Sequence, residues 1–173
     1  IIADAALFTW LGENADDVLR LSPEAALHMV ARSCEIKADV VSQDEKESGL
    51  RRILNFGHTI AHAIEKETGY SRYNHGEAVA IGSLGAAYIS RSLGMIDETT
   101  VSRVRELTEQ LGLPLAAEGC TVDALYAAIF HDKKTVGGKV NWVLMEDIGK
   151  VVVRSDVPEG VVREAMERCL EKG

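Results

Sequence analysis

Apolar side chains recur at intervals of three and four along most of the chain, which is the period of amphipathic helices. The spacing predicts helices over residues 3–15, 22–43, 50–68, 76–92, 97–111, 121–130 and 158–170. Two β-like runs, residues 140–145 and 151–154, are joined by a short connection and predict a hairpin. With no repeat or break in composition, the chain is expected to form a single mainly α domain, a helical bundle with a small β-hairpin, over residues 1–173.

Start and stop signals place several of these boundaries. Ser22 before Pro23 is typical of an N-cap followed by proline in the first helical position, and Asp97 is expected to cap a later helix. Small side chains occur throughout residues 76–92, which fits a helix packed closely in the centre of a bundle. The helix over 22–43 carries one apolar stripe, consisting of Leu27, Val30, Ala31, Cys34, Ala38 and Val41.

Charge and cysteine content limit the expected partners and the expected cellular compartment. The net charge of −8 argues against nucleic acid or an anionic membrane as the main partner. No apolar run approaches the roughly 20 residues of a membrane span. The three cysteines are far apart and lack a CxxC pattern, so we expect free thiols in a reducing compartment, the cytoplasm. The chain opens without methionine on helical sequence, which predicts a piece of a longer protein.

Histidines form the first candidate site. His58 and His62 are four residues apart, so on a helix they share one face, and His75 begins the next helical pattern. An isolated histidine is most often a packed side chain bonded to a backbone carbonyl, but three within eighteen residues favour a divalent metal site, with or without an adjacent base. No Glu follows His58 directly, which disfavours a HExxH metallopeptidase.

A basic and polar group accompanies the histidines. Arg51, Asn55, His58 and His62 form one stripe along the predicted helix 50–68. A solvated face would explain charged residues there, but it does not explain an Asn and two His. A site for an anionic substrate beside a metal does, because Arg suits carboxylate or phosphate.

The motifs around these residues resemble those of the 3-dehydroquinate synthase family, in order across most of the chain. They are Lys37-Ala38-Asp39-Val40-Val41, Asp44-Glu45, Gly49-Leu50-Arg51, Leu54-Asn55-Phe56-Gly57-His58-Thr59, His62-Ala63-Ile64-Glu65, His75-Gly76-Glu77-Ala78-Val79 and Asp132-Lys133-Lys134. The resemblance implies the C-terminal, mostly helical domain of the dehydroquinate synthase-like fold. It also implies NAD, a divalent metal (usually zinc, with cobalt possible) and conversion of 3-deoxy-arabino-heptulosonate 7-phosphate to 3-dehydroquinate and phosphate, in the shikimate pathway.

The resemblance also implies roles for individual residues. His58 and His75 would be metal ligands, His62 a proton-transfer residue, and Glu47 a catalytic carboxylate, although Glu is ordinary in the charged connection that contains it. The family is usually dimeric, so a homodimer is a further expectation.

Substrate binding would fall to Lys37, Arg51, Asn55 and one of Lys133 or Lys134, which would hold the carboxylate and phosphate of the sugar acid. The family's Gly-rich nucleotide-binding domain and its Glu-x-x-Lys metal segment are not in this sequence; the latter would fall just before Ile1. Two histidines make a weaker site than two histidines and a carboxylate. The 173 residues alone are therefore expected neither to bind NAD well nor to turn over.

Three alternatives remain open from the residues. One is another sugar-phosphate cyclase, such as a 2-deoxy-scyllo-inosose synthase or a sedoheptulose 7-phosphate cyclase, although the extra cations favour a carboxylate-bearing substrate. Another is a polyol dehydrogenase of the glycerol dehydrogenase kind. The last is a non-catalytic helical module that binds metal or only packs as a subunit.

Overall fold

The computed structural model describes residues 1–45, 49–134 and 140–170, with the backbone alone for residues 131–134. Glu47 and the side chains of Lys133 and Lys134 therefore lie outside the described part. The elements in chain order are α1 (Ala5–Glu13), α2 (Ala15–Leu19), α3 (Pro23–Gln43), the 3₁₀ helix η1 (Leu50–Asn55), α4 (His58–Glu67), α5 (His75–Ser92), α6 (Glu98–Gln110), α7 (Val122–Lys134), β1 (Trp142–Asp147), β2 (Lys150–Arg154) and α8 (Glu159–Arg168).

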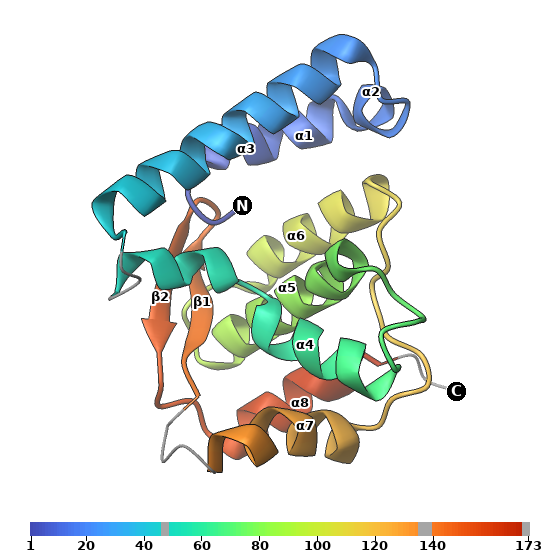
Figure 1. Cartoon of the computed structure of the whole chain (residues 1–173), viewed down its shortest axis with the longest axis vertical. Helices are drawn as coiled ribbons and strands as arrows, with labels where there is room; N and C mark the ends of the chain where they lie inside the picture. The colour runs from blue at the N-terminus through green and yellow to red at the C-terminus, as the bar shows by residue number, and fades with distance from the viewer. Residues whose placement is uncertain (46–48, 135–139, 171–173) are drawn as a thin grey trace.

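The prediction of a helical bundle with one small hairpin is confirmed (Figure 1). Helix α5 runs through the centre, with α4, α6 and α8 around it and the antiparallel β1–β2 hairpin along one side. Helices α1, α2 and α3 form a separate layer across one end. Helices α7 and α8 occupy the opposite end.

Small side chains place α5 at the centre of the molecule. Ala78, Ala87 and Ile81 on this helix are fully buried, and Gly82 lies so close to α4 that no methyl group would fit there. Asn74 accepts the N–H of Glu77 while the Glu77 carboxylate accepts the N–H of Asn74, a reciprocal cap that fixes where the helix begins. Among the described residues no helix, α5 included, is long and apolar enough to cross a membrane.

The hairpin is attached to α5 through a buried hydroxyl. Val143 pairs with Val153, and Leu144 with Val152, in the antiparallel register. The Met145 N–H donates to Ser90 Oγ at 2.9 Å, and that hydroxyl donates to the Ala86 carbonyl at 2.7 Å. Because Ser90 is completely buried, these bonds hold the sheet at one distance from the helix.

The prediction of one continuous helix over residues 50–68 is wrong. The chain forms a 3₁₀ helix to Asn55, turns at Gly57 with φ 78°, and starts α4 at His58. The turn follows from close packing, because a Cβ on Gly57 would lie 2.6 Å from Ser83 Oγ of α5. The Asp44 carboxylate holds the start of η1 by accepting the N–H groups of Gly49 and Arg51.

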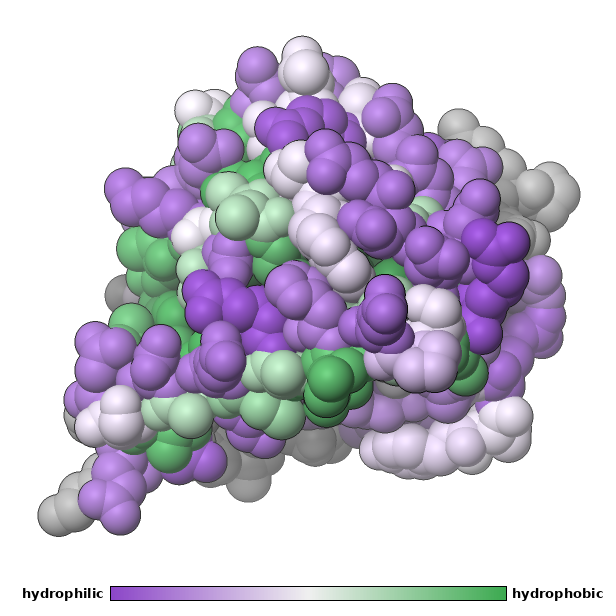
Figure 2. Space-filling view, turned by 90° about the horizontal axis from the view of Figure 1, so that it is seen from above, coloured by the Kyte–Doolittle hydropathy of each residue, from purple (hydrophilic) through white to green (hydrophobic). Residues whose placement is uncertain are grey.

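Helix α3 turns its apolar stripe outward. Leu27 is 71% exposed and Val30 is 54% exposed, whereas Ala25 and Val40 are buried on the opposite face. Figure 2 looks onto this end of the molecule and shows green hydrophobic side chains among the purple hydrophilic ones. A stripe with helical period does not by itself tell which side of the helix faces the core.

Asp4 connects α3 to α1, and we expect its removal to destabilise the fold at neutral pH but not in acid. Its carboxylate caps α1 through the Leu7 N–H at 2.8 Å and accepts from Arg32 Nε at 2.6 Å. The Leu7 N–H, and then the Arg32 guanidinium, hold the pKa of Asp4 below its ordinary value. Asp4→Ala should lower the free energy of unfolding by about 1–2 kcal/mol at pH 7.

The direction of the pH effect follows from this lowered pKa. The carboxylate stabilises the folded chain above the ordinary aspartate pKa of about 3.9, and the contribution is lost as the pH falls toward the lower folded-state value. Denaturant titrations should therefore show the gap between the variant and the unsubstituted chain closing below about pH 4. Asp39→Ala, at an exposed position on α3, is the control and should change little. A gap that persisted unchanged at pH 2–3 would contradict this role of the carboxylate.

Candidate metal and substrate site

Three imidazoles converge where α4 and α5 begin. The ring centroids of His58 and His75 are 5.1 Å apart, those of His58 and His62 are 5.6 Å apart, and those of His62 and His75 are 6.0 Å apart. The turn at Gly57 makes His58 the first residue of α4, and the Asn74 cap makes His75 the first residue of α5. Close packing of the two helices therefore brings together residues that are up to seventeen positions apart in the sequence.

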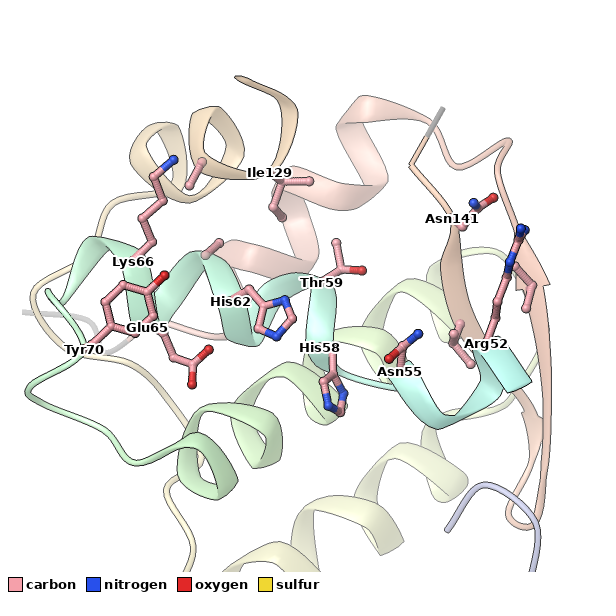
Figure 3. Close-up of a pocket in the computed structure, with 14 residues that line it drawn as sticks. Arg52, Asn55, His58, Thr59, His62, Glu65, Lys66, Tyr70, Ile129 and Asn141 are labelled. Atoms are coloured by element: carbon pink, nitrogen blue, oxygen red, sulfur yellow. The ribbon is translucent and has the colours of Figure 1, made fainter. Parts of the chain in front are cut away.

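Two of the rings are oriented by bonds to protein oxygens. His58 Nδ1 lies 3.0 Å from the Phe56 carbonyl oxygen, and His75 Nδ1 lies 2.9 Å from Glu65 Oε1. A carbonyl or carboxylate oxygen only accepts, so each Nδ1 carries a hydrogen, and in the neutral ring each Nε2 then has a lone pair. Figure 3 shows His58, His62 and Glu65 pointing to the same side of α4, with Lys66 pointing away from them.

These donors fit a divalent metal such as zinc, which takes imidazole nitrogen and carboxylate oxygen. His58 and His75 form one set, in which both Nε2 atoms have lone pairs. His62, Glu65 and His75 form a second set, whose ligand atoms lie within 4.8 Å of one another. The described residues thus offer two arrangements that share His75.

A cavity of about 760 Å³ adjoins the histidines. Its walls come from η1 and α4 on one side and from α7 and the hairpin on the other, with Asn141 at the start of the hairpin. Figure 3 shows polar groups at both ends, Arg52 and Asn141 at one and Lys66 and Tyr70 at the other. The lining residues are Arg52, Asn55, His58, Thr59, His62, Ala63, Glu65, Lys66, Tyr70, Ala128, Ile129, Asn141, Val143 and Val153.

The break in the predicted helix changes which arginine faces this cavity. Asn55 lines it, but Arg51 does not, and the Arg51 guanidinium donates to the Glu45 carbonyl at 3.1 Å. In a 3₁₀ helix, residues three apart lie on the same side, so Arg52 shares the cavity face with Asn55. Lys37 lies exposed on α3 and is not among the residues that line the cavity.

Sequence reasoning missed several residues at this site. Arg52 could be recognised only if the 3₁₀ segment were anticipated, and Lys66 and Tyr70 carry no motif that distinguishes them from surface residues. Glu65 had a usable signal, since a charged residue among the apolar positions of α4 indicates a buried partner.

Comparison with known proteins gives these residues a family. The family model described as 3-dehydroquinate synthase C-terminal matches residues 1–135. The chain is 44% identical over 170 residues to a 3-dehydroquinate synthase of Aliivibrio fischeri strain MJ11, covering 98% of this chain and 47% of that protein. It is 50% identical over 163 residues to one from Caldanaerobacter subterraneus subsp. tengcongensis, covering 94% and 46%. The chain thus spans about half the length of these relatives.

Solved structures agree with this placement. A 2-epi-5-epi-valiolone synthase from Streptomyces hygroscopicus subsp. jinggangensis 5008, with NAD+ and Zn2+ bound, superimposes with a TM-score of 0.84 at 29% identity over 96% of this chain and 46% of that one. A 2-deoxy-scyllo-inosose synthase complexed with carbaglucose-6-phosphate, NAD+ and Co2+ gives 0.73 at 26% identity, over 86% and 42%. Because the family model matches most of the chain, residues 1–135, this chain belongs to the 3-dehydroquinate synthase C-terminal family.

Proposed function

We propose that this chain supplies the metal and substrate residues of a 3-dehydroquinate synthase, which converts 3-deoxy-arabino-heptulosonate 7-phosphate to 3-dehydroquinate and phosphate in the cytoplasm. The observation that carries the proposal is the convergence of three imidazoles beside a large polar-ended cavity. Relatives at 44–50% identity bearing that name support it.

In this proposal the metal is held by His58 and His75 through Nε2. When bound, a divalent ion such as zinc polarises an adjacent hydroxyl and lowers its pKa. The solved neighbours hold Zn2+ or Co2+, which supports a divalent ion without choosing between them. They also hold NAD+, but no described residue of this chain forms a nucleotide-binding motif, so we assign none to that cofactor.

His62 is the residue we assign to proton transfer. It lines the cavity, and its ring lies 5.6–6.0 Å from those of the proposed ligands. Neutral imidazole accepts a proton near pH 7, which suits removal of a proton from a substrate held beside the metal.

Cations and amides around the cavity would hold the anionic substrate. Asn55 and Arg52 line one end, where an amide and a guanidinium can bind a carboxylate or phosphate. We keep Lys37, Arg51, Glu47, Lys133 and Lys134 as predictions from the family resemblance. Side chains fixed on helices would hold the flexible open-chain sugar in one conformer.

Phosphate release tests the proposed function. In a protein that joins this chain to the nucleotide-binding domain of the family, 3-deoxy-arabino-heptulosonate 7-phosphate should release phosphate only when NAD and a divalent metal are present. Release from a sugar phosphate without a carboxylate, and not from this substrate, would indicate a different cyclase. NAD reduction by a polyol without phosphate release would indicate a dehydrogenase. If neither sugar phosphate nor the polyol reacts, the chain would be a non-catalytic module.

A further inference from the structure

We propose that Glu65 is a positioning residue of the metal site: it accepts the Nδ1–H of His75 and so keeps the Nε2 of that ring available to an ion shared with His58. The inference rests on the proposed function, because it takes His58 and His75 as the ligands. In this proposal Glu65 bonds to the ligand His75 and does not bind the ion itself.

Glu65 is buried and is hydrogen-bonded to His75. The residue is only 8% exposed and lies on α4 beside the fully buried Ile64. A carboxylate in such a place is costly unless it is hydrogen-bonded. Its Oε1 lies 2.9 Å from His75 Nδ1, across ten positions of sequence.

The His75 ring needs such an anchor. His75 is the first residue of α5, and its side chain is 57% exposed, so packing alone leaves it freedom to rotate. The bond from Glu65 fixes both the ring orientation and the position of the ring hydrogen. Metal-ligating histidines are commonly held in this way, with the second ring nitrogen donating to a carboxylate or carbonyl.

His58 follows the same arrangement through a different acceptor. Its Nδ1 lies 3.0 Å from the Phe56 carbonyl oxygen, so its Nε2 also keeps a lone pair. Two rings on different helices thus present the same kind of nitrogen, each held from behind by a protein oxygen. This pairing supports His58 and His75 as the ligands.

The contact distance argues against Glu65 as a direct ligand with His75 Nδ1. Two ligand atoms about 2.0–2.1 Å from one tetrahedral zinc are about 3.3 Å apart. The distance of 2.9 Å between Glu65 Oε1 and His75 Nδ1 is instead that of a charge-assisted hydrogen bond with a proton between the atoms. In that arrangement the imidazole ring separates Glu65 from an ion bound at Nε2.

Cobalt binding to the chain and its Glu65→Gln variant tests the proposal. Affinity measured by competition with a chromophoric chelator should fall 10–100-fold in Glu65→Gln, since the amide is a weaker acceptor than the carboxylate. Glu67→Gln removes the same charge from an exposed position on the same helix and should bind cobalt as the unsubstituted chain does. Circular dichroism establishes that each variant is folded.

A second measurement does not depend on the variant folding. Long-range proton–nitrogen NMR of the unsubstituted chain without metal should show the neutral His75 ring with its hydrogen on Nδ1. The opposite tautomer would overturn the proposal even if Glu65→Gln failed to fold.

The outcomes separate this proposal from the proposed function. Equal cobalt affinity in Glu65→Gln and Glu67→Gln would overturn the positioning role and leave the metal site standing. Complete loss of binding in folded Glu65→Gln, as in His75→Ala, would overturn it by making Glu65 a direct ligand. No cobalt binding by the unsubstituted chain would overturn the assignment of His58 and His75 as a metal-binding pair and with it the role of Glu65, whereas phosphate release in the joined protein tests the proposed function separately.

Discussion

Gly82→Ala is expected to lower the free energy of unfolding by about 3 kcal/mol and to weaken metal binding at the same time. A Cβ at this position would lie 2.1 Å from the Gly57 carbonyl oxygen and 3.0 Å from the Ala61 nitrogen. Both are backbone atoms of the segment that carries His58 and His62, and backbone cannot rotate away as a flexible side chain does. Helix α4 must therefore move away from α5, which carries His75.

Gly160→Ala is the matched control for this substitution. Gly160 is also a helical glycine, on α8, and a Cβ there meets nothing within 4 Å. Alanine should leave the fold as stable as before or stabilise it by up to about 1 kcal/mol, because glycine is a poor helix former. Urea unfolding and cobalt competition measure both effects. A Gly82→Ala chain as stable as the unsubstituted one would show that α4 and α5 are not in backbone contact.

The order of elements could be predicted because each helix carries its own period and its own caps. Ser22 and Asp97 cap α3 and α6 as predicted, each accepting the N–H three residues later. The break at Gly57 could not be predicted in the same way. The break is caused by contact with Ser83 and Gly82, which are distant in sequence. The local pattern of residues 50–68 contains no sign of this contact and therefore predicts an unbroken helix.

The candidate site divides along the same line. His58 and His62 could be placed on one face because both lie within α4, beyond the break. The predicted face includes Arg51 because it assumes that the helix runs unbroken through Gly57. In the 3₁₀ segment, Arg52 and not Arg51 lines the cavity beside Asn55. The partner of His75 depends on how α4 and α5 pack, which no spacing within one helix reveals.

His62→Ala is expected to reduce phosphate release about 10²–10⁴-fold while leaving cobalt affinity unchanged, because we assign this ring to proton transfer and not to the ion. The measurement uses the enzyme with its nucleotide-binding domain, at saturating 3-deoxy-arabino-heptulosonate 7-phosphate. His75→Ala should instead abolish both metal binding and turnover. His28→Ala is the control, since the His28 ring packs at a tilt against Trp10, with the ring centroids 4.2 Å apart, in the layer formed by α1, α2 and α3.

Comparing His62→Ala with His75→Ala decides between the two donor sets. If the ion lies between His58 and His75, only His75→Ala loses cobalt binding. His62→Ala then keeps it, because His62 only lines the cavity. If the ion lies among His62, Glu65 and His75, both variants lose cobalt, and the ligand assignment is then wrong. Because these rings are within 6.0 Å of one another, activity alone cannot separate the two arrangements, and the metal affinity of His62→Ala carries the decision.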